Sequence, residues 1–265
     1  EANRSSCLRS RCSHYQQCAF YNARRRAVEA KIVVVNHALV LATLTQESSL
    51  LKPSQSLFVF DEGHHLPEVA VEAFSTHVQL DRFVRACGRA GGLLTKAAEL
   101  LSAEMRQQVP PHRLALQDAA RELERIRDEL GEIPIETKNG VTRFANGELP
   151  GEWQPVVDGL YPAVNTGAQF GVQVLQELAD RGAEDQRIKV QADRATMEMG
   201  PVIRQLVDGA ELLRLWRAKG AVPMAKWLQR NEKTGGITLC ASPLTGAKGL
   251  AEHVWSTVGA AVVTS

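Results

Sequence analysis

The residues best suited to chemistry in this 265-residue chain are two adjacent carboxylates, Asp61 and Glu62, in the sequence D-E-G-H-H-L-P. They follow the apolar run Leu57–Phe60, which is typical of a buried strand in a parallel sheet. Open α/β sheets bind ligands at the carboxyl ends of such strands. Asp61 could hold a hydrated Mg²⁺ there, and Glu62 could orient or deprotonate a water that attacks a phosphate. A strand that simply ends in a polar turn would have the same composition.

Three cysteines near the start form a candidate metal site. Cys7, Cys12 and Cys18 are spaced C-x₄-C-x₅-C, which is looser than the C-x₂-C knuckle of small zinc sites. Three thiolates need a fourth ligand to complete a zinc site or a cubane cluster. His14, Cys87 or a cysteine upstream of this sequence could supply it, and three free thiols are the alternative. The total of five cysteines does not form an even disulfide framework.

Basic and aromatic residues follow the cysteines. Residues 1–31 carry seven Lys or Arg against two acids, a net charge of +5, whereas residues 32–80 carry one Lys against five acids, a net charge of −4. The predicted helix Ala19–Ala30 carries the triplet Arg24, Arg25 and Arg26, with Tyr15, Phe20 and Tyr21 close by. Basic side chains among aromatics can bind phosphates and stack on unpaired bases. A solvated helix face is the alternative.

These sites must be positioned by a sheet. The apolar run Ile32–Val35 predicts a strand that ends in Asn36 and His37, and a helix at Ala38–Ala42 follows. With the strand Leu57–Phe60, these elements predict a βαβ unit and therefore a parallel sheet. Asn36 and His37 would then also lie at a carboxyl end of the sheet, although a histidine that merely closes a turn is the commoner case.

The pattern then changes to helices and later returns to strands. Spacings of three and four residues between apolar side chains predict helices at Leu80–Gln108, Arg113–Leu130, Trp153–Arg181 and Arg187–Lys219. We expect breaks at Pro110–Pro111 and over Gly131–Gly151. A hairpin of Ala225–Arg230 with Ile237–Ala241, a short helix at Ala247–Val254 and a strand at Ala260–Val263 complete the predicted elements. The chain thus leaves a sheet, builds a helical domain and returns.

With these motifs in hand, the sequence resembles the iron–sulfur DNA helicases of superfamily two, and within them the bacterial DinG type. The likeness covers nearly the whole chain. It is carried by the cysteine cluster and by four further motifs in the family's order: V-V-V-N-H-A-L at Val33–Leu39, D-E-G-H-H-L-P at Asp61–Pro67, R-F-A-N-G-E-L-P at Arg143–Pro150, and the closing V-V-T-S.

The resemblance implies a mixed α/β fold: part of a RecA-like P-loop motor domain, interrupted by an iron–sulfur segment and an all-α arch domain. The expected divisions are 1–30 for the cluster segment, 31–78 for the motor with its DEAH-type box, 79–222 for the arch and 223–265 for the return to the motor. No run of 18 apolar residues and no export signal occur, so we expect a soluble, cytoplasmic protein. We also expect a monomer.

The resemblance also implies an activity. Such helicases hydrolyse ATP to move 5′ to 3′ on single-stranded DNA and unwind duplexes, forks and DNA–RNA hybrids in repair and replication. Asp61 would coordinate Mg²⁺, Glu62 would activate the water, and His64 would couple the nucleotide site to DNA. Thr264 and Ser265 would begin the family's T-S-A-T-L coupling motif. A single-strand-binding protein is a further candidate partner.

The remaining roles follow from the same likeness. Cys7, Cys12 and Cys18 match three of four [4Fe–4S] ligands, and the fourth lies upstream in the family, so Cys87 is an improbable ligand and His14 is not needed. Independently of the resemblance, we expect DNA contacts at Arg24, Arg25, Arg26, Asn36 and His37.

The sequence departs from the family in two respects. No G-x-x-x-x-G-K-[ST] phosphate loop occurs, and the second motor domain is absent. We interpret both as truncation and expect this polypeptide alone to be inactive. The alternative is a non-enzymatic, zinc-containing nucleic-acid-binding module. A nuclease–helicase fusion is a third hypothesis, which only upstream sequence can test.

Overall fold

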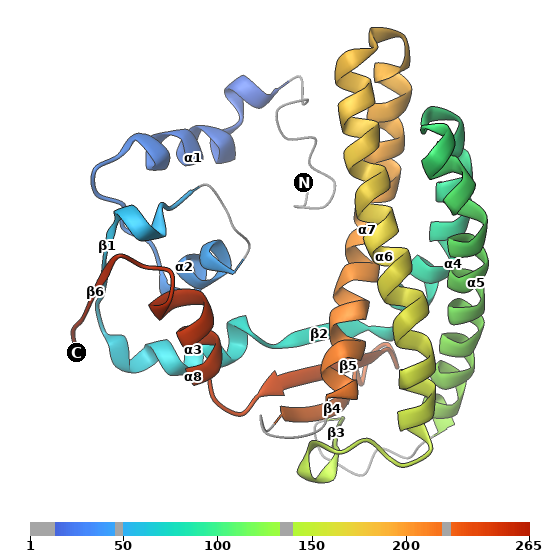
Figure 1. Cartoon of the computed structure of the whole chain (residues 1–265). Helices are drawn as coiled ribbons and strands as arrows, with labels where there is room; N and C mark the ends of the chain where they lie inside the picture. Colours follow the sequence, from blue (N-terminus) through green and yellow to red (C-terminus); the bar gives the residue numbers. More distant parts are fainter. Residues whose placement is uncertain (1–13, 46–49, 133–139, 219–223) are drawn as a thin grey trace. The chain divides into compact units, whose positions relative to one another are not determined.

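The computed structural model describes residues 14–45, 50–132, 140–218 and 224–265 (Figure 1). They form two compact units. The box unit comprises the described residues up to Ser75 together with Ser242–Ser265, and the helical unit comprises Thr76–Ala241. Together they form a mixed α/β protein, as predicted. No helix in the described ranges is long and apolar enough to span a membrane.

The box unit is built on two parallel strands, β1 (Leu57–Phe60) and β6 (Ala260–Val263), as Figure 1 shows. Phe58 and Phe60 point into a small apolar core. The helices of the unit are α1 (Ala19–Glu29), α2 (His37–Leu44), α3 (Leu66–Ala73) and α8 (Ala247–Leu250), which continues as a π-helical turn at Ala251–Trp255. In the described part of the unit, short 3₁₀ helices also lie at Tyr15–Gln17, Pro53–Gln55 and Gly63–His65.

The other face of this small sheet is open. Leu57 and Val59 alternate with the buried phenylalanines and are exposed, and so is Val262 of β6, which pairs with Val59. Parallel sheets are normally covered on both faces because their strands are apolar on both sides. The described part of the box unit therefore presents an uncovered apolar surface.

The predicted strand at Ile32–Val35 was wrong. This segment has no regular secondary structure and belongs to no sheet among the described residues, and the side chains of Ile32 and Val34 are 84% and 92% exposed. A strand exists only through hydrogen bonds to a neighbour, and the described neighbour of β1 is β6. The predicted βαβ unit is therefore absent from the part of the chain that the structure describes, and the parallel pair instead joins distant segments.

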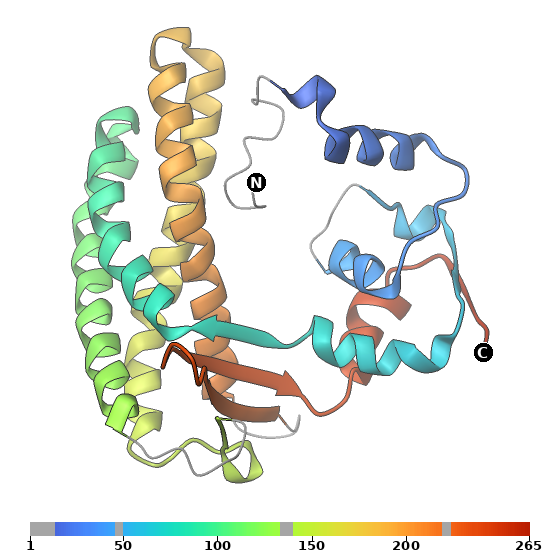
Figure 2. The ribbon, with the colours of Figure 1, turned by 180° about the vertical axis from the view of Figure 1, so that it is seen from behind.

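The helical unit contains four long helices and a four-stranded sheet (Figures 1 and 2). The helices are α4 (Leu80–Ala97), α5 (Ala103–Glu132), α6 (Trp153–Glu184) and α7 (Gln186–Arg217). The sheet has the order β2-β5-β4-β3, with β2 at Thr76–Gln79, β5 at Ile237–Pro243, β4 at Met224–Arg230 and β3 at Val141–Arg143. The predicted hairpin is thus present, and it lies with the helical unit up to Ala241.

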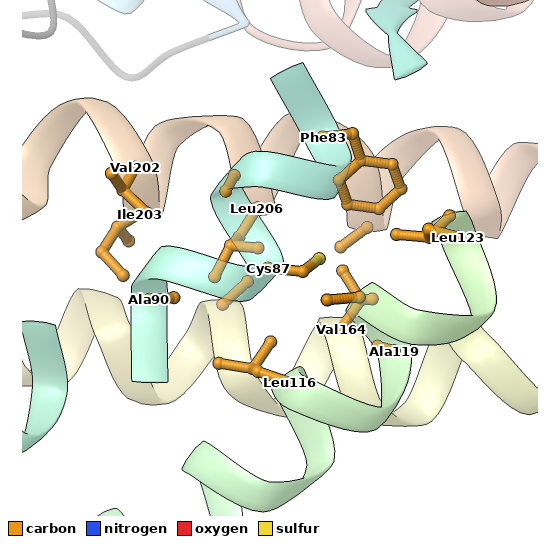
Figure 3. Packing of buried hydrophobic residues seen from close by; sticks show 14 of the residues in the cluster. Phe83, Cys87, Ala90, Leu116, Ala119, Leu123, Val164, Val202, Ile203 and Leu206 are labelled. Atoms are coloured by element: carbon orange, nitrogen blue, oxygen red, sulfur yellow. The ribbon is translucent and has the colours of Figure 1, made fainter. Parts of the chain in front are cut away.

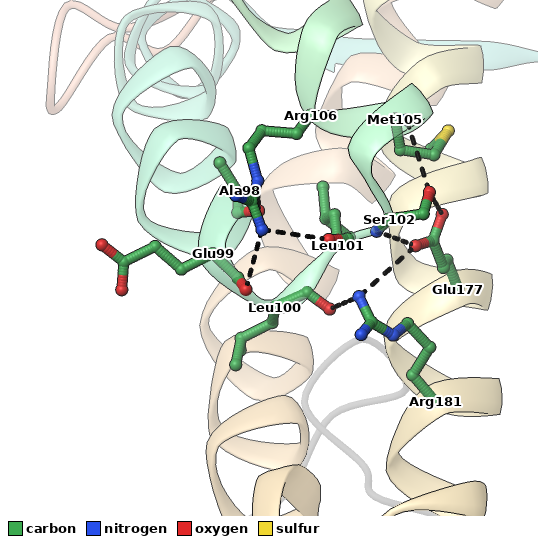
Figure 4. Close-up of polar contacts among 9 residues, drawn as sticks. All are labelled: Ala98, Glu99, Leu100, Leu101, Ser102, Met105, Arg106, Glu177 and Arg181. Atoms are coloured by element: carbon green, nitrogen blue, oxygen red, sulfur yellow. Dashed lines mark hydrogen bonds and ion pairs between the residues drawn. The ribbon is translucent and has the colours of Figure 1, made fainter.

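The predicted helix break at Pro110–Pro111 was also wrong. Helix α5 passes through both prolines, and the break falls earlier, at the 3₁₀ turn Ala98–Leu100 and at Leu101–Ser102. Side chains from α5 and α6 satisfy the backbone there. Arg106 donates to the carbonyl oxygens of residues 98, 99 and 101 (Figure 4).

Helix α6 completes these contacts. The Glu177 carboxylate accepts from the Ser102 amide at 2.5 Å, and Arg181 Nη1 donates to the Leu100 carbonyl oxygen at 2.7 Å (Figure 4). These groups replace the helical hydrogen bonds that the break removes. The break is therefore held by distant side chains, which local sequence patterns do not reveal.

The core of the helical unit is continuous and tightly packed. Figure 3 shows Cys87 of α4 enclosed by Leu116, Val164 and Leu206 from the three other helices. Glycines permit the closest contacts. A Cβ atom on Gly209 of α7 would lie 2.2 Å from the ring of Phe83, which is completely buried.

We predict that Gly209→Ala destabilises the protein by about 1–3 kcal/mol, because the added methyl group overpacks the core against Phe83. Gly159→Ala is the matched control. A Cβ at this exposed position of α6 meets no atom within 4 Å, so the higher helix propensity of alanine should stabilise by up to about 1 kcal/mol. Urea unfolding measures both changes. Equal effects of the two substitutions would contradict the packing described here.

Candidate active site

The pairing of β1 with β6 positions the candidate site. Phe60 is in register with Val263, so the two parallel strands end side by side. Two backbone hydrogen bonds extend the pairing beyond the strands: the Thr264 amide donates to the Phe60 carbonyl at 2.9 Å, and the Gly63 amide donates to the Thr264 carbonyl at 2.7 Å. The residues after each strand are therefore held next to one another.

Side chains complete this junction. The Thr264 hydroxyl donates to Asp61 Oδ1 at 3.0 Å, across 203 residues of sequence. His64 Nδ1 lies 3.2 Å from the Ser265 hydroxyl and 3.2 Å from Glu62 Oε2. The structure thus brings together the three candidate residues of the box, Asp61, Glu62 and His64, and the two residues of the expected coupling motif, Thr264 and Ser265.

The backbone at Glu62 is unusual. Its φ of 51° and ψ of 45° lie in the left-handed region, which costs a residue with a Cβ about 1–2 kcal/mol. Gly63 follows, buried against β6, where a Cβ would lie 2.2 Å from Val263 Cγ1. The strained turn directs the chain into α3. Sequence analysis missed both features, although a glycine directly after two acids is a signal of close backbone approach.

The chemistry available here is that of exposed oxygen ligands. The side chains of Glu62 and His64 are 63% and 53% exposed, and Asp61 is also exposed. Carboxylate and hydroxyl oxygens from Asp61 and Thr264 are hard donors of the kind that Mg²⁺ prefers. The donor set therefore fits a hydrated magnesium ion beside a phosphate, while the phosphate loop that would complete such a site does not occur in this sequence.

Two predicted DNA-contacting residues have structural roles. The Asn36 side chain caps α2 by accepting from the Leu39 amide at 2.8 Å. The His37 ring lies 5.9 Å from the ring of Phe60, between centroids, and is half-buried. Asn36 immediately precedes α2 and His37 begins it. Neither residue follows a strand of the described sheets, so the predicted reason for placing them at the carboxyl edge of a sheet does not apply.

The arginine triplet lies on α1, none of whose side chains is buried. Arg25 donates to the Gln16 carbonyl at 3.2 Å and to Asn22 Oδ1, and its guanidinium lies 5.3 Å from the centre of the Tyr15 ring. Arg24 lies 5.8 Å from the Phe20 ring. The predicted interleaving of basic and aromatic side chains is therefore present on an exposed helix.

The cluster ligands are described only in part. Cys7 and Cys12 lie outside the described residues, and Cys18 is a half-buried free cysteine at the N-cap of α1. Within the described ranges, no group of three or more His, Cys, Asp or Glu side chains could hold a metal ion. Burial raises the pKa of Cys87 to about 12, and metal ligation requires a thiolate, so this core cysteine is unsuited as a fourth ligand.

We predict that Glu62→Gly stabilises the protein by up to about 1 kcal/mol, because glycine adopts the left-handed conformation without a Cβ clash. Glu68→Gly is the control. Glu68 lies in the first turn of α3, where glycine has low helix propensity and the carboxylate favours the helix dipole, so we expect destabilisation by about 1 kcal/mol. Thermal unfolding gives both values. Destabilisation by Glu62→Gly as large as that by Glu68→Gly would show that the turn is unstrained.

Comparison with known proteins shows what this chain is similar to. A family model described as DEAD_2 matches residues 6–83, which include the box. The protein "ATP-dependent DNA helicase DinG" of Escherichia coli K12 is 30% identical over 262 residues, covering 89% of this chain and 34% of the helicase. Its namesake from Salmonella choleraesuis is 29% identical, with the same two coverages.

A more distant relative extends the match. The DinG helicase of Photobacterium profundum is 25% identical over 276 residues, covering 100% of this chain and 39% of the relative. The chain thus spans little more than a third of the length of these curated relatives. The resemblance that the motifs predicted is therefore confirmed: along almost its whole length, this chain is similar to a segment of the DinG-type DNA helicases.

Proposed function

We propose that this chain is the box-containing part of an ATP-dependent DNA helicase and that Asp61 and Glu62 serve its ATP hydrolysis. The observation that carries the proposal is the hydrogen bond from Thr264 to Asp61, at the shared end of β1 and β6. It connects the residue suited to magnesium with the segment that continues as the coupling motif in the family. The similarity to DinG-type helicases supports the same function.

The roles of the residues follow from their positions. Asp61 presents an exposed carboxylate that would hold Mg²⁺, which would neutralise charge on the phosphates of ATP. Glu62, directly after it, would orient the attacking water and accept its proton. Thr264 and Ser265 contact Asp61 and His64, so a change at the nucleotide would alter the end of β6. We propose this route as the coupling between ATP hydrolysis and DNA movement.

The rest of the fold is consistent with a larger motor. The open apolar face around Leu57 and Val59 and the exposed side chains of Ile32 and Val34 would be covered if further strands and helices of a RecA-like domain packed on them. The helical unit would be the arch domain. The intact protein would move 5′ to 3′ on single-stranded DNA as a cytoplasmic monomer and unwind forks or hybrids, with a single-strand-binding protein as a candidate partner.

We predict that Glu62→Gln in the intact protein lowers DNA-stimulated ATP turnover by at least about 100-fold, because the amide cannot accept a proton from the attacking water. DNA affinity should remain within a factor of two to three of wild type. Glu68→Gln, at an exposed carboxylate on α3, is the control and should keep wild-type turnover. Full turnover by Glu62→Gln would remove Glu62 from this role.

The cysteines support a second part of the proposal. We propose that Cys7, Cys12 and Cys18 are three ligands of a structural [4Fe–4S] cluster, with the fourth upstream and with Arg24, Arg25 and Arg26 as neighbouring DNA contacts. Such a cluster would hold the basic α1 segment in shape.

We predict that the purified intact protein contains iron and acid-labile sulfide in a ratio near one and that Cys12→Ser abolishes its visible absorption together with unwinding. Elemental analysis and absorption spectra measure the cluster, and Cys240→Ser serves as a control at a buried cysteine of the helical unit. Zinc without iron would instead favour the non-enzymatic, zinc-containing module, and full unwinding without a cluster would exclude a structural role for it.

A further inference from the structure

Helix α4 carries a row of cations that the functions described above do not use. Arg82, Arg85, Arg89 and Lys96 are exposed and follow one another at steps of three, four and seven residues, which places them on one face of the helix. We call this row the α4 stripe. The opposite face is fixed in the core by buried side chains, namely Leu80, Phe83, Val84, Cys87, Ala90 and Leu94. The stripe is therefore presented to solvent by a rigid helix.

The α4 stripe differs from the other charged faces of the helical unit. Among the described residues, none of its four cations forms an ion pair or a hydrogen bond. On α5, α6 and α7, by contrast, every Arg and Lys except Arg113 and Lys189 has an acidic or carbonyl partner; examples are Arg121 with Asp118, Arg194 with Glu198 and Arg204 with Asp208. Positive charge on those helices is locally neutralised, whereas on α4 it is not.

The residues between the cations leave them accessible to a ligand. Gly88, Gly92 and Thr95 are exposed on the same face, so no bulky side chain separates the cations from an approaching chain. No acid occurs between Asp81 and Glu99, and Asp81 interacts electrostatically with Arg127. Lys96 lies beside Glu99 and Glu198 at the edge of a groove between α4 and α7. The three arginines therefore form the strongest part of the stripe.

The dimensions suit a phosphate backbone. From Arg82 to Lys96 the helix rises by about 21 Å, and phosphates of one DNA strand recur about every 3.4 Å along a duplex axis. Arginine side chains spaced along this length can each reach a different phosphate. The stripe has no exposed aromatic side chain on which a base could stack, so it offers contacts to the backbone without sequence preference.

We propose that the α4 stripe is a DNA-binding surface that contacts the phosphate backbone through Arg82, Arg85 and Arg89. The inference rests on the proposed helicase function, which supplies DNA as the ligand, and adds a contact on the helical unit to those expected at α1. The contribution of this surface to DNA affinity falls steeply with salt because each phosphate contact releases a counterion.

The test is DNA binding by the intact protein with Arg82, Arg85 and Arg89 each replaced by Gln, which keeps helix propensity while removing three charges. Fluorescence anisotropy with labelled single-stranded and duplex oligonucleotides, across a salt series, measures affinity. We expect about tenfold or greater weakening at 0.1 M salt and a plot of log affinity against log salt that is shallower by about 2 to 3. The oligonucleotide that shows the larger change identifies the form of DNA bound.

The control replaces Arg121, Arg194 and Arg204 by Gln, which removes the same charge from exposed but paired positions. It should leave the salt slope unchanged. A second variant with Lys at the three stripe positions should retain most of the affinity and, with matching circular dichroism, excludes misfolding. If the Gln stripe variant and wild type have equal DNA affinity and equal salt slope while DNA still stimulates wild-type ATP turnover, the α4 proposal alone is overturned. If wild type neither binds DNA nor hydrolyses ATP, the proposed helicase function is overturned as well.

Discussion

The parallel pairing of β1 with β6 is the constraint on which the rest of the box unit depends. It joins segments that lie about 200 residues apart and places Asp61 within hydrogen-bond distance of Thr264. Glycine is required at position 63 because a Cβ atom there would collide with the side chain of Val263. The close approach also lets the Gly63 amide donate to the Thr264 carbonyl. Without this pairing, the box would be a polar turn at the end of an isolated strand, and no group from the C-terminal segment would reach it.

The strain at Glu62 belongs to the same constraint. A left-handed residue between the end of β1 and a buried glycine is retained because hydrogen bonds on both sides fix the backbone. The turn points the side chain of Glu62 toward His64 and leaves both exposed. In the proposed reaction, the left-handed backbone at Glu62 lowers the stability of the folded protein but places a carboxylate beside the magnesium-binding position. The helical unit shows the reverse arrangement, with glycines that close its core and ion pairs that neutralise most of its surface.

Local signals made much of the fold predictable. The strands at Leu57–Phe60 and Ala260–Val263, the late hairpin and the long helices were recognised because apolar spacing records which side of an element is buried. Prediction failed where contacts with residues distant in sequence determine whether an element forms or where it ends. The run Ile32–Val35 has strong strand propensity but no described partner strand, and the break near Leu101 depends on Glu177 and Arg181 from another helix. The same limit applies to the site. Its residue types were readable, while the strained turn and the side-chain contacts were not.

The most direct test of the account is DNA-stimulated ATP turnover by the intact protein with Thr264→Val, measured beside Thr257→Val. Both variants lose a hydroxyl of the box unit, but the Thr264 hydroxyl donates to Asp61, whereas that of Thr257 donates to the His253 carbonyl. A hydrogen bond to a charged group contributes about 1.5–3 kcal/mol. The account therefore predicts a ten- to hundredfold loss of turnover for Thr264→Val alone. Wild-type turnover by a correctly folded Thr264→Val protein would contradict the claim that the paired strand ends form one catalytic site.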